Sequence, residues 1–157
     1  MARVQSMLLA GFALLAHAVP EAMAHGTLAC VVEDRSLSLA LNATAAAAKG
    51  YGLTEVTGSL AVKLDGTPRD AGRLDLNRQS VAQYWFQDRN LKLFIVEEKA
   101  DGPRSETASV WLDLKQVRTD VTTYRGSYRL QSRHRDAKTT GAGIVQEASG
   151  YAECSAD

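Results

Sequence analysis

Alternation of apolar and polar residues is the dominant pattern along this chain. From Val56 to Leu64 every second residue is apolar or glycine, and the residues between them are polar or small. Because successive side chains of a strand point to opposite faces, a period of two predicts a strand with one face on a core and the other in water. Three similar runs, together with the apolar run Leu91–Val96, predict these core residues: Leu37, Leu39, Leu41, Leu60, Val62, Leu64, Leu93, Ile95, Val110, Leu112, Tyr128 and Leu130.

Turn signals separate these runs and set the expected fold class. Asp65–Pro68 and Asp101–Pro103 combine aspartate, glycine and proline, and Gln87–Asn90 is a polar link typical of a hairpin. Several short strands at roughly ten-residue spacing are typical of antiparallel all-β proteins. We therefore predict an all-β fold, either a small antiparallel β-sandwich or a barrel.

Three segments do not fit a simple strand pattern. Ala43–Lys49 is rich in alanine and is followed by Gly50, which favours a short helical turn with a glycine cap. Gln79–Phe86 fits either a helix or a strand. The polar stretch Ser132–Gly143, which contains His134, predicts a long loop.

The first 24 residues have the features of a removable signal peptide. Arg3 precedes Met7–Ala16, a ten-residue apolar run that is too short to span a bilayer as a helix. Ala22–Ala24 supplies the small residues that a signal peptidase requires, and cleavage after Ala18 is an alternative. We expect residues 25–157 to remain as a single β domain, exported to the periplasm or secreted, with no membrane contact once residues 1–24 are removed.

The two cysteines, Cys30 and Cys154, stand near the two ends of the mature chain. An even number of cysteines in an exported chain predicts a disulfide, and two cysteines allow one pairing. Their separation is 154 − 30 = 124 positions. In the chain-entropy model a loop of that length is stabilised by about 4–5 kcal/mol. The expected β fold is therefore closed by one disulfide.

Charge and composition exclude several classes of protein. The chain has 18 Lys and Arg against 18 Asp and Glu, and removal of Arg3 and Glu21 leaves 17 against 17. This balance argues against a nucleic-acid binder, which needs a basic excess. All three methionines and His17 lie in the signal segment. With the cysteines paired, the mature chain lacks the ligands for haem with His/Met ligation or for an iron–sulfur cluster, so we expect no cofactor.

The common catalytic motifs are absent from the sequence. It contains no GxSxG elbow, HExxH pair, P-loop or GxGxxG stretch. Glu33–Asp34 and Glu97–Glu98 are adjacent carboxylates, which on a strand point to opposite faces. The main hypothesis is therefore a non-catalytic binding or inhibitor-like module whose ligand is a protein or a small molecule. A small hydrolase whose carboxylates converge only in the fold remains an alternative.

Aromatic residues provide the candidate ligand-binding positions. Tyr84, Trp85 and Phe86 are consecutive, and Trp111 lies within an alternating run. We expect at least two of the three consecutive rings to lie in the core, while strand alternation allows one to face outward. Exposed rings stack on sugars or flat ligands and are enriched at protein interfaces. Tyr84, Trp85 and Trp111 are therefore the candidate binding residues.

The first alternative to a binding module depends on the N-terminus of the mature chain. Cleavage after Ala24 makes His25 the first residue, with an α-amine and an imidazole together. Both groups bind Cu(II), and His134 is the other histidine of the mature chain that can supply a third nitrogen. This set resembles the histidine brace of copper-dependent polysaccharide oxygenases and of CopC-type periplasmic copper carriers. The resemblance implies a periplasmic copper-binding protein that uses His25 and His134.

Overall fold

The computed structural model describes residues 26–46, 52–64, 73–87, 89–117, 122–136 and 143–156. This part of the chain is all-β, as the alternation predicts, with a single short 3-10 helix, η1. The predicted signal peptide, residues 1–24, lies outside the described residues, and so does His25. The elements are β1 (Gly26–Glu33), β2 (Leu37–Ala46), β3 (Gly52–Val62), β4 (Leu74–Leu76), η1 (Arg78–Ser80), β5 (Val81–Gln87), β6 (Asn90–Asp101), β7 (Arg104–Gln116), β8 (Thr123–Asp136) and β9 (Ile144–Ala156).

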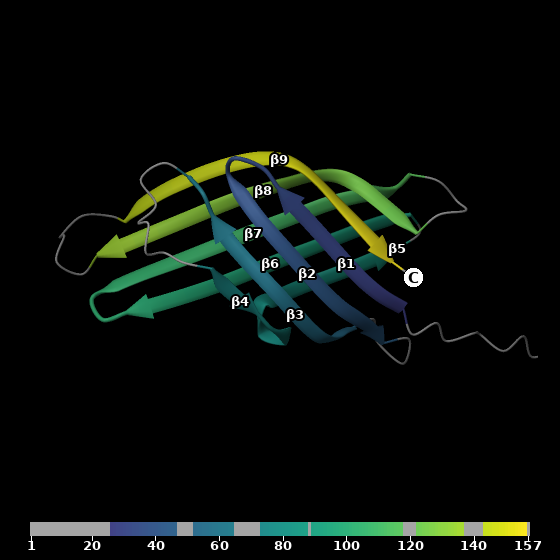
Figure 1. Ribbon diagram of the computed structural model, residues 1–157, viewed down its shortest axis with the longest axis horizontal. Helices are drawn as coiled ribbons and strands as arrows, with labels where there is room; N and C mark the ends of the chain where they lie inside the picture. Colours follow the sequence, from purple (N-terminus) through teal and green to yellow (C-terminus); the bar gives the residue numbers. More distant parts are fainter. Residues whose placement is uncertain are drawn as a thin grey trace, which may run out of the picture.

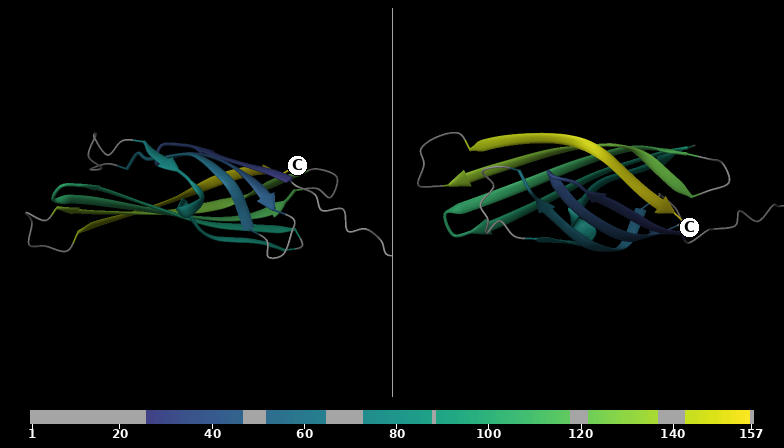
Figure 2. Two further views of the ribbon diagram at one scale, coloured as in Figure 1. Left: turned by 90° about the horizontal axis from the view of Figure 1, so that it is seen from below. Right: turned by 45° about the horizontal axis from the view of Figure 1, so that its top comes forward.

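The described strands form one antiparallel sheet in the order β4-β3-β2-β1-β9-β8-β7-β6-β5. Each strand pairs with its neighbours in the chain, except that β4 and β5 are the two ends of the sheet and β1 pairs with β9. The sheet folds over on itself, so that β1–β4 lie over β5–β8 while β9 bends to connect the two layers (Figure 1, Figure 2). The two layers are therefore halves of one continuous sheet.

The core lies between the two layers and is formed by the inward positions of the alternating runs. Leu37 and Leu60 from one layer, and Ile95 and Val110 from the other, are completely buried. Ten of the twelve predicted core residues are buried, and the remaining two, Val62 and Leu64, are partly buried and pack against the same cluster. The burial of these alternate residues confirms which side chains of each strand were predicted to point into the core.

A disulfide between Cys30 and Cys154 joins the first strand to the last, as predicted. The two residues are direct partners in the β1–β9 pairing, and each is 1% exposed. Only four residue pairs join β1 to β9, whereas thirteen join β7 to β8. The disulfide therefore reinforces the short pairing through which the two layers are connected.

The structure corrects two of the expected segments. Ala43–Ala46 is the end of strand β2 and not a helical turn, because Ala43 pairs with Leu28 of β1 and Ala45 with Leu53 of β3. The rest of the expected turn lies outside the described residues. The expected loop from residue 132 is strand as far as Asp136, because β8 pairs with β7 as far as Asp136 and with β9 as far as His134. His134 therefore lies on a strand.

The ambiguous segment from residue 79 contains both a helical turn and a strand. Arg78–Ser80 forms η1, and Val81–Gln87 forms β5. Asn77 caps the turn: its side-chain oxygen accepts a hydrogen bond from the backbone N–H of Gln79 at 2.8 Å, and its own N–H donates to the Ser80 hydroxyl at 2.8 Å. This cap satisfies the backbone groups at the start of the turn and directs the chain into β5.

Candidate functional site

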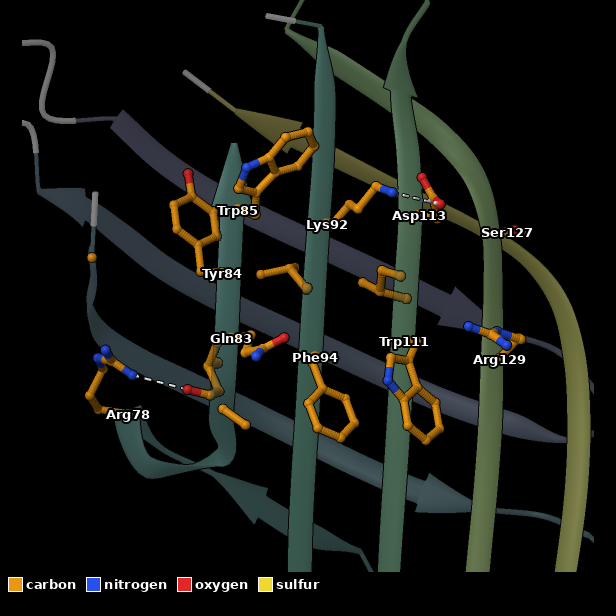
Figure 3. A pocket seen from close by; sticks show the side chains of 15 residues that line it. Arg78, Gln83, Tyr84, Trp85, Lys92, Phe94, Trp111, Asp113, Ser127 and Arg129 are labelled. Atoms are coloured by element: carbon orange, nitrogen blue, oxygen red, sulfur yellow. Dashed lines mark hydrogen bonds and ion pairs between the residues drawn. The ribbon is translucent and has the colours of Figure 1, made fainter. Parts of the chain in front are cut away.

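The described residues form a groove of about 940 Å³ on the outer face of β5–β8 (Figure 3). We call it the aromatic groove. Strand register sets two rows of side chains across this face. One row contains Trp85, Lys92, Asp113 and Ser127, and the other contains Gln83, Phe94, Trp111 and Arg129.

These side chains face outward because their neighbours in the chain are buried in the core. Leu93 lies between Lys92 and Phe94, and Leu112 lies between Trp111 and Asp113. Leu93 is 2% exposed and Leu112 is 1% exposed. The hydrophobic core thus holds the strands in the register that aligns the groove side chains from one strand to the next.

The aromatic rings of the groove are partly packed against one another. The rings of Phe94 and Trp111 stack across β6 and β7, with centroids 4.7 Å apart and planes inclined by 15°. Trp85, by contrast, is 44% exposed. The chain has only two tryptophans, and both line this groove. Large apolar rings in water cost free energy unless a ligand or partner covers them, so this face has the character of a binding surface.

Charged groups flank the rings. Lys92 Nζ is 3.3 Å from Asp113 Oδ2 and 5.6 Å from the centroid of the Trp85 ring. The guanidinium carbon of Arg129 lies 5.8 Å from the centroid of the Trp111 ring. Among the described residues, no carboxylate forms an ion pair with Arg129. Of these two cations, Lys92 is therefore paired with a carboxylate, whereas Arg129 forms no ion pair with a described carboxylate.

A second, smaller hollow of about 490 Å³ continues the surface over β8 and β9. It shares Trp111 and Arg129 with the aromatic groove. Its far side includes Glu147, which accepts a hydrogen bond from Gln131 Nε2 at 2.9 Å. Arg129 thus lies where the two hollows meet.

The three predicted binding residues occupy different positions relative to the groove. Trp85 and Trp111 project from its floor, and Tyr84 lies at its edge on the opposite side of β5 (Figure 3). Tyr84 and Phe86 are partly buried against the core, and Phe86 packs edge-to-face on Tyr124 with centroids 5.6 Å apart. Burial, with a smaller contribution from Tyr124, raises the pKa of Tyr84. That these residues bind a ligand stays a prediction.

Sequence reasoning missed the polar and charged part of the groove. Gln83, Lys92 and Arg129 lie on three different strands, and only the strand register brings them to one face. Alternation along each strand does indicate that Lys92 and Arg129 point outward, because each is next to a predicted core residue. That signal does not fix which residues of two strands are opposite each other, so it cannot assemble the groove.

Of the two residues proposed for copper, His134 is described and lies outside the groove. His134 is opposite Glu106 in the β7–β8 pairing, and neither lines the groove. The Nδ1 atom of His134 is buried without a hydrogen-bond partner, and burial raises the pKa of the Glu106 carboxyl against the opposing effect of His134 and Lys99. Within the described residues, no group of three or more His, Cys, Asp or Glu side chains is placed to hold a metal ion. Whether His25 approaches His134 stays a prediction, because His25 lies outside the described residues.

The groove does not supply the carboxylates that the hydrolase alternative needs. Among the described residues that line it, Asp113 is the only carboxylate, and it is paired with Lys92. Glycoside hydrolysis and related acid–base chemistry use two carboxyl groups that approach the same bond. The arrangement is suited to holding a ligand by stacking, hydrogen bonds and charge.

Comparison with other proteins gives no further guide to function. No protein-family model matches the chain, and no curated protein or solved structure matches it significantly. The described part of the chain contains no helix with the length and hydropathy needed to cross a membrane.

Proposed function

We propose that the mature chain is an exported, non-catalytic binding module that holds its ligand in the aromatic groove. The observation that carries this proposal is the exposed Trp85 beside the stacked pair Phe94 and Trp111, with cationic side chains on the same face. Ligand sites typically combine aromatic surface with a few placed polar groups, and tryptophan and arginine dominate the binding energy of protein interfaces. The described lining of the groove has this composition and holds one carboxylate, where acid–base catalysis uses two.

Export is part of the same proposal. It is supported by the signal-like features of residues 1–24 and by the buried Cys30–Cys154 disulfide. Disulfides form and persist in oxidising compartments such as the periplasm or the extracellular space. The ligand is therefore expected among molecules of the cell envelope or the surrounding medium.

Intrinsic fluorescence provides a direct test, because both tryptophans of the chain line the groove. Purified protein is titrated with four ligand classes: neutral glycans, acidic glycans, unfolded peptides and aromatic carboxylates. We expect at least one class to change the emission in a saturable way. The Trp111→Ala variant should abolish binding while the far-ultraviolet circular dichroism stays unchanged.

Val31→Ala is the matched control, because Val31 is an apolar residue that is 58% exposed on β1, outside the groove. It should bind as the wild type does. Absence of binding by all four classes, or binding that is unaffected by Trp111→Ala, would contradict the proposed function.

A further inference from the structure

The charge of the aromatic groove differs from that of the whole chain. Its described lining contains three cations, Arg78, Lys92 and Arg129, and one carboxylate, Asp113, which gives an excess of 3 − 1 = 2 positive charges. The complete sequence has equal numbers of acidic and basic residues. A local positive site on a neutral protein points to a ligand that carries negative charge.

The three cations are not equally available to a ligand. Lys92 is paired with Asp113, and Arg78 donates a hydrogen bond from Nη1 to the backbone oxygen of Val81 at 3.1 Å. Arg129 is exposed, forms no ion pair with a described carboxylate, and has its guanidinium over Trp111. Stacking uses the face of a guanidinium and leaves its N–H groups free to donate in the plane. Arg129 is therefore positioned for a bidentate bond to a carboxylate of the ligand.

The aromatic rings indicate what accompanies that carboxylate. Trp85 is exposed at the β5 end of the groove, three strands away from Arg129 on β8. A ligand that reaches both must extend across the strands. Pyranose rings have apolar C–H faces that pack on aromatic side chains, and their hydroxyls match the polar groups of Gln83, Asp113 and Ser127 in the same two rows.

The spacing between the strands of this surface also matches the spacing between sugar residues in a polysaccharide. The two rows cross four strands, and neighbouring strands lie about 4.8 Å apart. One sugar residue of an extended chain has a similar length, so successive residues meet successive strands.

From these observations we infer that the aromatic groove binds an acidic polysaccharide, with a uronate carboxylate on Arg129 and a sugar ring against Trp85. The inference rests on the proposed function and adds the chemical class of its ligand. A single-stranded nucleic acid also combines stacking with negative charge, but it depends on a basic surface that follows its backbone, and two of the three described cations of the groove, Lys92 and Arg78, already have protein partners.

The test compares polygalacturonate with its fully methyl-esterified form, which keeps the backbone and removes the charge, and with oligothymidylate. Tryptophan emission is followed during each titration at low and at moderate salt. We expect saturable binding of polygalacturonate that weakens with salt, and no comparable response to the ester or to the oligonucleotide.

Arg129→Gln is the decisive variant, and Arg125→Gln is its matched control. Arg125 lies on the same strand, is paired with Glu153 at 2.7 Å, and does not line the groove, while its substitution removes the same charge. Loss of a charge-assisted hydrogen bond should weaken polygalacturonate binding roughly tenfold or more in Arg129→Gln and less than about twofold in Arg125→Gln.

Several results would overturn the inference. Equal binding of the ester, equal effects of the two arginine variants, or a response to oligothymidylate alone would each contradict an acidic glycan. A response only to peptides or aromatic carboxylates that Trp111→Ala abolishes would overturn the inference and leave the proposed function standing. If none of these ligands binds, both are wrong.

Discussion

A hydrogen bond between Tyr128 and Asp34 joins the two layers. The Tyr128 hydroxyl donates to Asp34 Oδ2 at 2.6 Å, and Asp34 Oδ1 accepts from the N–H groups of Ser36 at 2.7 Å and Leu37 at 2.9 Å. Burial and the Asp34 carboxylate raise the pKa of Tyr128 to about 12, so its hydroxyl keeps its proton and remains a donor. This contact ties β8 to the turn between β1 and β2.

Gly150 makes room for that contact. It is opposite Tyr128 in the β8–β9 pairing, and a Cβ at this position would lie 2.6 Å from Tyr128 Cε1 and 2.6 Å from Asp34 Oδ2. Because the Tyr128 ring is fully buried and cannot move aside, Gly150→Ala should destabilise the fold by about 1–3 kcal/mol. Urea unfolding measures the loss. The exposed neighbour Ser149→Ala should change stability by less than about 0.5 kcal/mol, and equal losses would contradict this account.

The lowered pKa of the Asp34 carboxyl should make the stability of the fold depend on pH. Burial raises the pKa of its carboxyl, but the hydrogen bonds from Tyr128, Ser36 and Leu37 outweigh burial and hold the pKa below its ordinary value of 3.8. A carboxyl with a lowered folded pKa stabilises the fold above its unfolded pKa, and this contribution is lost as the pH falls through the folded pKa. Unfolding midpoints measured from neutral pH to about pH 3 should therefore decline at the acid end.

Asp34→Asn tests the assignment, because the amide oxygen still accepts hydrogen bonds but carries no titrating charge. The variant should be less stable at neutral pH and should show a flatter acid limb than the wild type. Glu33→Gln is the comparison: hydrogen bonds from Lys63 and Ser38 lower the pKa of the Glu33 carboxyl as well, but Glu33 is solvent-exposed, so water screens its interaction with Lys63. Exposed ion pairs contribute little, so its acid limb should resemble that of the wild type. An unchanged limb in Asp34→Asn would contradict the role given to this carboxyl.

At the scale of elements, strands are predictable where alternation is clear. The run Val110–Leu114 has one interpretation, since only a strand places every second residue on a core, and the burial of Val110, Leu112 and Leu114 agrees. The helical turn expected at Ala43 is wrong because alanine favours a helix in isolation, whereas pairing with β1 and β3 decides the outcome. The loop expected at His134 is wrong because the polar residues around it form the end of β8, where His134 pairs with Glu106 of β7 and with Ile144 of β9. Polar composition alone does not show this pairing.

The register of β7 gives a direct prediction. Leu112 is 1% exposed and belongs to the core, whereas Asp113 is exposed on the opposite face and pairs with Lys92. Leu112→Ala should lower the free energy of unfolding by about 2–5 kcal/mol, because it removes buried methyl groups and leaves a cavity. Asp113→Ala should lower it by less than about 1 kcal/mol, the value of an exposed ion pair. Similar losses in the two variants, measured by urea unfolding, would contradict the register.

At the scale of the whole molecule, the connection between the layers is short. β1 and β9 share the pairs Leu28↔Ala156, Ala29↔Ser155, Cys30↔Cys154 and Val31↔Glu153. The number of cysteines predicts the disulfide, but not that it lies at this connection. The aromatic groove is built by β5–β8, whose pairings with one another are longer. A change that weakens the β1–β9 connection should therefore lower the stability of the fold without altering the groove.

The disulfide separates these two properties experimentally. The double variant Cys30→Ser/Cys154→Ser avoids a free thiol and opens a loop of 124 positions, so unfolding should cost about 2–5 kcal/mol less than in the wild type. Wild-type protein treated with a reductant should lose a similar amount.

At urea concentrations below its unfolding midpoint, the double variant should keep the tryptophan emission of the wild type. Trp85 and Trp111 lie on strands that the disulfide does not join. It should also bind the same groove ligand with unchanged affinity. Loss of the tryptophan signature at native conditions would contradict this separation and would mean that the β1–β9 connection holds the groove strands in place. Unchanged stability would mean that pairing of β1 with β9 and the core between the layers suffice without the covalent link.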